Sequence, residues 1–236
     1  MAKTSIEWTE ITWNPVTGCT KVSEGCRYCY AETMSRRLQA MKLEKYKQGF
    51  GKIITHPSTL ADPYEWKVPK MVFVNSMSDL FHTDVPDSFI CEVFKTMNDN
   101  PEHTFQVLTK RIDRAIKFNN KVNWTPNIWL GTSIENSQVI HRAEILKLSD
   151  AKIKFLSCEP LLGSIKGIDL NGLDWIIVGG ESGKKARPMK EEWVLEIRDL
   201  CLVNGISFFF KQWGGTNKKR AGRVLDGLLH NEIPAQ

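Results

Sequence analysis

The sequence lacks the features that mark membrane, secreted and repetitive proteins. No apolar run in its 236 residues approaches the roughly 20 residues that cross a bilayer. The first ten residues, MAKTSIEWTE, contain no apolar stretch that could act as a secretory signal. Internal repeats and low-complexity segments are also missing. We therefore expect a cytoplasmic protein that has no membrane partner.

A strong excess of one charge is missing as well. Hydrophobic residues make up 42% and charged residues 25%, which are the proportions of an ordinary globular domain. The net charge of +5 permits an anionic partner such as a nucleic acid but does not require one. We interpret the densest basic run, residues 217–223, as a solvated surface turn.

Histidine and cysteine are both scarce, and only cysteine is clustered. The five histidines show no metal-ligand spacing. Of the six cysteines, Cys19, Cys26 and Cys29 fall within eleven residues, whereas Cys91, Cys158 and Cys201 are isolated. In a reducing compartment such a local cluster indicates a metal site or a redox centre rather than disulfides. Structural zinc usually needs four N or S ligands, and no second C-x2-C or H-x3-H supplies the fourth, so zinc is the weaker alternative.

The rest of the chain alternates apolar runs with amphipathic segments. The near-continuous apolar runs predict buried parallel strands at Met71–Asn75, Phe105–Thr109, Ile128–Thr132, Ile153–Ser157, Trp175–Gly179 and Ile206–Lys211, and Ile11–Thr17 is the candidate for an additional first strand. Helical patterns cover about 27–47, 87–99, 111–119, 136–148 and 190–203, with Asp87 and Asn136 as N-caps and Gly205 as a C-cap. Residues 49–70 form a long proline-containing excursion, and residues 214–236 a C-terminal extension.

This alternation predicts one α/β domain over residues 1–236. We expect a partial or distorted (β/α) TIM-like barrel of six to seven mostly parallel strands, with the cysteines in a loop before the first helix. A doubly wound open sheet is the alternative. In either fold the functional site lies at the carboxyl ends of the strands.

The cysteine cluster itself is a C-x6-C-x2-C motif within GCTKVSEGCRYCYA, residues 18–31. Three thiolates on one loop can hold three irons of a [4Fe–4S] cluster and leave the fourth iron without a protein ligand. A small molecule can then chelate that open iron.

The motif resembles the cluster loop of the radical S-adenosylmethionine superfamily, in which an aromatic residue precedes the last cysteine, as Tyr28 does here. The commonest spacing in that superfamily is C-x3-C-x2-C, so the first gap departs from it. Over most of the chain, the order of EWTEITWNPVTGC, CRYCYAE, VFVNSMSDLFH, LTKR, WLGTSIE, SCEPLL, VGGESG and KQWGG resembles a family of uncharacterised, often phage-associated three-cysteine-motif proteins. For a phage-encoded protein the expected compartment is the host cytoplasm.

The resemblance implies a [4Fe–4S] cluster on the three cysteines and S-adenosylmethionine (SAM) on the open iron. Reductive cleavage of SAM then yields a 5′-deoxyadenosyl radical that abstracts hydrogen from a substrate. A flavodoxin- or ferredoxin-type protein is the implied electron donor. The substrate is unknown, and the net positive charge of the chain favours a nucleic acid or a nucleotide.

Polar residues follow six of the predicted strands, and we expect them to line the cofactor pocket. Lys110, Arg111 or the Gly179-Gly180 turn suits the SAM carboxylate, Asp79 or Glu135 the ribose, and Glu159 or Glu181 the sulfonium. The full predicted cofactor set is Tyr28, Ser76, Asp79, Lys110, Ser133, Glu135, Glu159, Gly179, Gly180 and Glu181.

Catalytic and substrate-binding roles are predicted for a smaller group. Cys158, Glu159 and Lys211 are the catalytic candidates, with Cys158 as a hydrogen-atom donor or, alternatively, a small buried apolar residue. Arg111, Lys211, Gln212 and Trp213 are the substrate-binding candidates, and the Trp213 ring can stack on a base. Two non-enzymatic functions stay open. One is a nucleic-acid-binding protein with a structural zinc or iron–sulfur site, and the other is a cluster protein that only transfers electrons.

Overall fold

Seven short apolar runs form one parallel sheet in the computed structural model, which describes residue 4 and residues 6–235. Every adjacent pair is parallel, and each strand pairs with the next strand of the sheet along the chain. The strands are β1 (Ile11–Trp13), β4 (Met71–Val74), β5 (Thr104–Thr109), β6 (Ile128–Ser133), β7 (Lys154–Cys158), β8 (Trp175–Gly179) and β9 (Ser207–Gln212).

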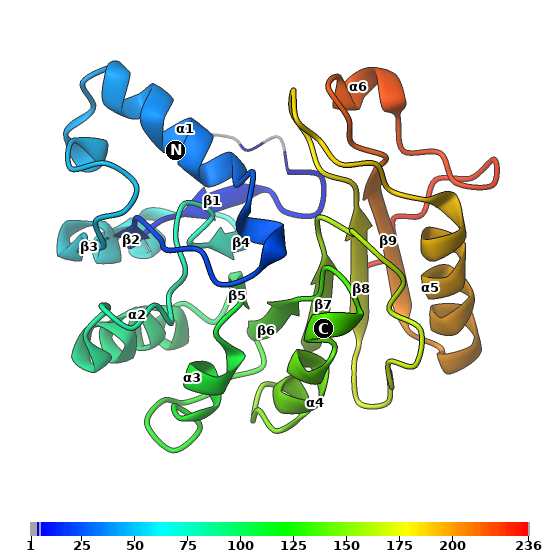
Figure 1. The fold of residues 1–236 in the computed structure, drawn as a ribbon. Helices are drawn as coiled ribbons and strands as arrows, with labels where there is room; N and C mark the ends of the chain where they lie inside the picture. Colours follow the sequence, from blue (N-terminus) through cyan, green and yellow to red (C-terminus); the bar gives the residue numbers. More distant parts are fainter. Residues whose placement is uncertain (1–3, 5, 236) are drawn as a thin grey trace.

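The strand order β1-β4-β5-β6-β7-β8-β9 never reverses, and this excludes the doubly wound alternative, which requires a reversal. Figure 1 shows the sheet curling into a half-barrel with its helices on the outside. In the described part of the chain β1 and β9 do not pair, so the sheet is a partial barrel and not a closed one. The predicted fold class is confirmed at this level.

The helices differ more from the prediction than the strands do. They are α1 (Tyr30–Ala40), α2 (Asp87–Asp99), α3 (Ile112–Ile116), α4 (His141–Lys147), α5 (Glu191–Asn204) and α6 (Lys218–Ala221), with short 3₁₀ segments at η1 (Glu24–Cys26), η2 (Glu44–Tyr46), η3 (Pro57–Glu65) and η4 (Ser137–Val139). The expected helix 27–47 is divided because Lys42 has a left-handed φ of 59°. The basic run 217–223, expected as a turn, contains α6.

Two of the three predicted caps are confirmed. Gly205 ends α5 with a φ of 65°, and the Asn136 side chain accepts a hydrogen bond from Gln138 N, 3.0 Å away. The third prediction, Asp87 as an N-cap, is wrong. Pro86 holds that position, and the Asp87 carboxylate instead forms ion pairs of 2.7 and 2.8 Å with Arg114 and Lys121.

The excursion at 49–70 is ordered, as expected. It contains η3 and the strand β3 (Ile54–Thr55), which pairs antiparallel with β2 (Val16–Thr17). The expected first strand Ile11–Thr17 is therefore divided between β1 and β2, which belong to different sheets.

The sheet has a buried layer on each face. The larger one joins the outer face to the helices and includes Phe89, Val93, Ile112, Ala143 and Val194. The smaller one fills the concave face, and its members alternate along the strands with those of the outer layer. They are Trp8, Phe73, Trp129, Ile153, Phe155, Trp175, Ile177 and Phe209. These side chains fill the amino half of the half-barrel, where Gln106 is a buried polar exception that donates to the Trp8 carbonyl at 3.3 Å. The ionisable side chains of the concave face lie at its carboxyl end.

The tryptophans expected in the core are buried: Trp8, Trp13, Trp124, Trp129 and Trp175, with Trp193 partly buried against it. No helix in the described residues combines the length and apolarity needed to cross a membrane.

Candidate functional site

The three clustered cysteines lie on one loop, residues 18–29, between β2 and α1. We call it the cysteine loop. Its thiols are half-buried and none is in a disulfide. The loop starts at Gly18, whose φ of +88° and close approach to the Lys52 carbonyl leave no room for a side chain. From there the loop contacts residues that follow β4, β5, β6 and β8, so it lies across the carboxyl edge of the sheet.

The first attachment of the cysteine loop is an ion pair between Asp79 and Arg111. The Arg111 guanidinium lies 3.0 Å from Asp79 Oδ2 and 3.6 Å from Cys19 Sγ, and its other nitrogen donates to the Thr20 carbonyl at 3.0 Å. Asp79 also accepts from Thr109 Oγ1 at 2.7 Å. Asp79 and Arg111 therefore hold the first cysteine at the end of β5.

The second attachment is the buried carboxylate of Glu135, which follows β6. Glu135 is 1% exposed and pairs with Arg142 of α4 at 3.0 Å. It also accepts hydrogen bonds from Ser23 Oγ and, at 3.2 Å, from Gly25 N. A Cβ on Gly25 would lie 2.8 Å from the same carboxylate, so the loop packs directly on it.

The third attachment is Arg187, in the segment after β8. It donates to both carboxylate oxygens of Glu181, at 2.6 and 2.9 Å, and to the Glu24 carbonyl at 3.2 Å. Its guanidinium lies 5.3 Å from the centre of the Tyr28 ring, and that of Arg27 lies 5.4 Å from it. Arg187 thus joins the cysteine loop to the end of β8.

Two histidines hold the threonines on either side of Cys19. His56 Nε2 is 2.8 Å from Thr17 Oγ1, and His82 Nε2 is 2.7 Å from Thr20 Oγ1. Burial and the neighbouring charge of Lys45 lower the pKa of His56 to about 4, so the ring is neutral at pH 7. Neither role follows from sequence spacing.

The donor chemistry of the loop fits an iron–sulfur cluster. Cysteine thiolates are the ligands of such clusters, and each binds a different iron of a cubane. The three sulfurs therefore need not converge on one point as they would around a single ion. In the described part of the chain no three His, Cys, Asp or Glu side chains are arranged to hold a metal ion. Burial and the Asp79 charge raise the pKa of Cys19 to about 11, against the lowering effect of Arg111, so metal binding there must release a proton.

A second polar group lies on the concave face, above the aromatic layer. Lys211 Nζ is 2.8 Å from Glu159 Oε1, and both side chains are mostly buried. The other Glu159 oxygen accepts from Trp8 Nε1 at 3.3 Å and from Ser157 Oγ at 3.2 Å. Gly179 makes room for this carboxylate, since a Cβ there would lie 2.9 Å from Glu159 Oε1.

Two polar side chains of the same face are unpaired. The Ser133 hydroxyl is buried and has no hydrogen-bond partner among the described residues. Lys110 is half-buried, and its ammonium has no acidic partner within residues 6–235. The register of β5 and β6, in which Thr109 pairs with Thr132, places Lys110 and Ser133 side by side at the strand ends.

Other predicted residues are fully buried or already hydrogen-bonded, so fewer of their polar groups are free to contact a ligand. Cys158 is fully buried in the outer layer, on the opposite side of β7 from Glu159, and burial raises its pKa well above the usual value. This placement favours the buried apolar residue over the hydrogen-atom donor. The Gly180 N–H donates to the Gln212 carbonyl at 2.9 Å, so it is not free for the SAM carboxylate.

The remaining candidates lie at the same edge. The Ser76 hydroxyl donates to Asn14, and the Ser76 carbonyl accepts from Tyr30 at 2.5 Å. The Gln212 amide donates to Ser182 at 2.6 Å, although its oxygen is unpartnered. The Trp213 indole donates to the Val224 carbonyl at 2.9 Å and its ring packs edge-on against Phe210.

One family model matches almost the whole chain. It covers residues 3–234, and its description is "Protein of unknown function (DUF5131)". The comparisons with curated proteins and with solved structures found no match.

Proposed function

We propose that this chain, which belongs to the DUF5131 family of proteins of unknown function, is a radical SAM enzyme. Cys19, Cys26 and Cys29 would hold its [4Fe–4S] cluster. One observation supports the proposal above others: a loop with three free thiols lies across the carboxyl edge of a parallel half-barrel, held by buried ion pairs at three strand ends. That edge is where parallel α/β folds place their chemistry.

The chemistry that a bound cluster supplies is one electron, which splits SAM into methionine and a 5′-deoxyadenosyl radical. The electron comes from a flavodoxin- or ferredoxin-type donor. The side chains of the protein must position SAM and the substrate and exclude water from the site.

The ion pairs of the cysteine loop change the predicted roles of three carboxylates. The sequence makes Asp79, Glu135 and Glu181 candidates for the ribose or the sulfonium, but each already binds an arginine. We assign them to positioning the cysteine loop. Buried and satisfied carboxylates of this kind fix geometry, because moving them would leave the partner arginine uncompensated.

The unpaired groups of the concave face are better suited to contact SAM. Lys110 provides a cation for the SAM carboxylate, and Ser133 a buried hydroxyl that needs a partner. The aromatic layer beneath them closes the amino end of the half-barrel to water.

Glu159 and Lys211 remain the catalytic candidates. Their 2.8 Å ion pair lies on the concave face, at the same edge of the sheet as Lys110 and Ser133. A proton can move between Nζ and a polar substrate while Glu159 holds the ammonium in place. Trp8 and Ser157 fix the carboxylate for this task.

Reductive cleavage of SAM tests the proposal. We expect the anaerobically reconstituted and reduced protein to release 5′-deoxyadenosine, detected by chromatography, even slowly without substrate. Protein that binds zinc in place of iron, or iron-loaded protein that has no affinity for SAM in calorimetry, would contradict it.

A further inference from the structure

Positive charge is concentrated along the carboxyl edge of the half-barrel. Residues 18–42 contain five basic and two acidic residues. Residues 181–190 contain four basic residues and one acidic residue, and residues 214–223 contain four basic residues and no acidic one. These three segments, which we call the basic rim, therefore have a formal charge of +10, whereas the whole chain has +5. The rest of the chain is net negative, so the protein has a strong charge asymmetry.

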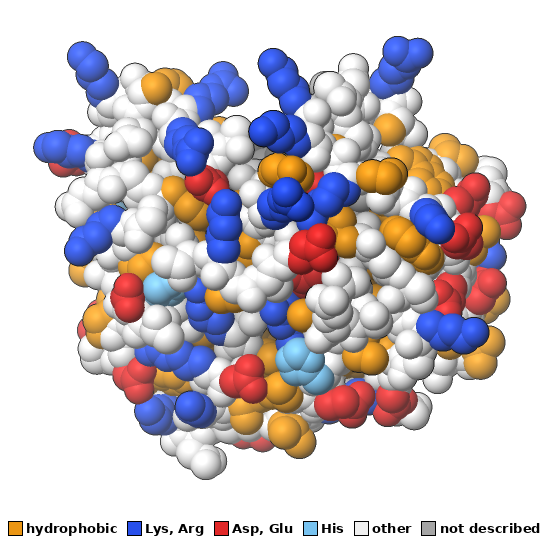
Figure 2. Space-filling view, in the orientation of Figure 1, with side chains coloured by type: hydrophobic (Ala, Val, Ile, Leu, Met, Phe, Trp, Pro, Cys, Tyr) orange, Lys and Arg blue, Asp and Glu red, His pale blue; other side chains and the backbone are white. Residues whose placement is uncertain are grey.

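The three segments of the basic rim are in contact with one another. Arg27 and Arg187 lie on the same ring of Tyr28 and join the cysteine loop to residues 181–190. Gly183 N donates to the Gly215 carbonyl at 3.1 Å, and Gly215 N donates to the Glu181 carbonyl at 2.7 Å. The rim is thus one continuous surface, and Figure 2 shows Lys and Arg side chains gathered along this upper side of the molecule.

Several cations of the rim have no acidic partner. In the described residues, Arg27, Arg37, Lys184, Lys185 and Arg220 form no ion pair, and all five are exposed. Other cations of the rim are paired with acids, as in Lys21–Glu32, Arg36–Glu32 and Arg187–Glu181, so the charge left for a ligand comes from the unpaired five. Unpaired clustered cations repel one another and are stabilised by an anionic partner.

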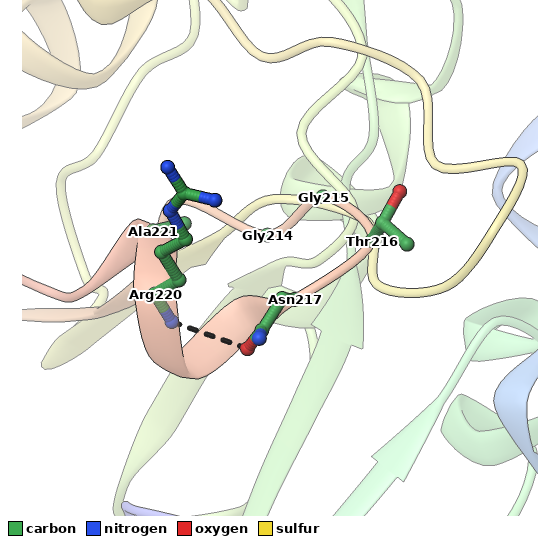
Figure 3. A pocket seen from close by; sticks show the side chains of 6 residues that line it. All are labelled: Gly214, Gly215, Thr216, Asn217, Arg220 and Ala221. Carbon is green, nitrogen blue, oxygen red and sulfur yellow. Dashed lines mark hydrogen bonds between the residues drawn. The ribbon is translucent and has the colours of Figure 1, made fainter.

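The end of the rim near β9 is hollowed. An open pocket of about 420 Å³ is lined by Gly214, Gly215, Thr216, Asn217, Arg220 and Ala221. Figure 3 shows that the backbone N–H of Arg220 donates a hydrogen bond to the Asn217 side chain. The Arg220 guanidinium makes no hydrogen bond to the other side chains drawn. This guanidinium is available to a ligand that lies along the rim.

The same edge presents an aromatic ring beside the cysteines. Tyr30 follows Cys29 and is 53% exposed, although its hydroxyl is held by the Ser76 carbonyl. Exposed aromatic rings within a basic tract are the features that bind single strands, because the cations follow the phosphates and the rings stack on unpaired bases. A membrane surface would be contacted by the same cations but would not need a fixed, hydrogen-bonded ring.

From these observations we infer that the basic rim binds the phosphate backbone of a single-stranded nucleic acid and places a base beside the cysteine loop. Binding itself requires only the surface. That the strand is also the substrate rests on the proposed radical function.

Fluorescence anisotropy with a labelled 20-nucleotide single strand tests the inference. The full-length protein is titrated at several salt concentrations, with and without iron loading. We expect salt-dependent binding, and a Lys184→Glu/Lys185→Glu double variant that binds more than about tenfold more weakly at low salt. The slope of log K against log salt should become shallower by about 1.4, which is about 0.7 for each phosphate that the variant no longer neutralises.

The matched control is Lys67→Glu/Lys152→Glu. It makes the same change in net charge at two exposed lysines that precede β4 and β7, at the opposite edge of the sheet. This control should retain nearly all of the affinity. Equal weakening by both double variants, no binding at low salt, or binding to phosphatidylserine vesicles but not to the oligonucleotide would overturn the inference. None of these results depends on SAM cleavage. The nucleic-acid-binding inference and the proposed radical function can therefore be disproved separately.

Discussion

Replacing Cys26 by alanine is expected to abolish both cluster binding and the release of 5′-deoxyadenosine. Cys26 is one of the three thiols on the cysteine loop, and the described residues contain no other group of three His, Cys, Asp or Glu side chains arranged to hold a metal ion. Loss of an outer partner of a metal ligand costs roughly 10- to 100-fold in affinity, so loss of a ligand itself should cost more. Iron and sulfide analysis after reconstitution, with chromatography of the reaction products, measures both effects.

Cys91→Ala is the matched control for this prediction. Cys91 is also a free, half-buried cysteine, but it lies in α2, away from the cysteine loop. We expect the control to bind as much iron as the unchanged protein. A Cys26→Ala protein with full iron content would show that the cluster, if present, uses other ligands.

Replacing Glu135 by alanine is expected to cause the largest loss of stability. The change would leave the Arg142 guanidinium buried at 8% exposure without its carboxylate, and would remove the acceptor for Ser23 and Gly25. Breaking a buried pair in this way costs roughly 3–5 kcal/mol of unfolding free energy. Urea denaturation should show this as a lower midpoint.

Glu144→Ala is the control for Glu135→Ala. Glu144 lies in α4 with Arg142, but its carboxylate is exposed where it pairs with Lys147, so its removal should cost no more than about 1 kcal/mol. If Glu135→Ala were as mild as this control, Glu135 would not be holding the cysteine loop as the structure indicates. A double replacement, Glu135→Leu with Arg142→Leu, should recover part of the stability because no charge is then buried alone.

The strands could be predicted from the sequence, and so could the edge of the sheet at which their polar end residues lie. Near-continuous apolar runs such as Trp175–Gly179 mark strands buried on both faces, and polar residues at their ends mark one edge of a parallel sheet. The helices were less well defined, because a single residue such as Lys42, with its left-handed φ, ends a pattern that otherwise continues.

Which side of each strand faces the concave surface could not be predicted. Side chains alternate along a strand, so Cys158 and Glu159 are neighbours in sequence but lie on opposite faces of the sheet. The aromatic layer, built from Phe155, Trp175 and Phe209 on three strands, shows which alternate residues of each strand face the concave side. This is why Glu159 remains a candidate, while the placement of Cys158 favours the alternative of a small buried apolar residue.

The partners of the carboxylates could not be predicted either. Arg142 lies in α4 and Arg187 in the segment after β8, and neither stands in a motif with the cysteines. These arginines pair with the carboxylates only because the fold brings their segments next to the cysteine loop. A weak signal did exist for one of them, because Arg142 is only seven residues after Glu135, in the helix that follows the β6 connection.

The measurement that tests the account most directly is the electron paramagnetic resonance spectrum of the reduced, reconstituted protein before and after addition of SAM. An iron that has no protein ligand should bind the amine and carboxylate of SAM, so we predict a clear shift of the cluster signal on addition, and none with Cys26→Ala. A [4Fe–4S] signal that stays the same at saturating SAM, or a protein that holds zinc and gives no signal, would contradict the account.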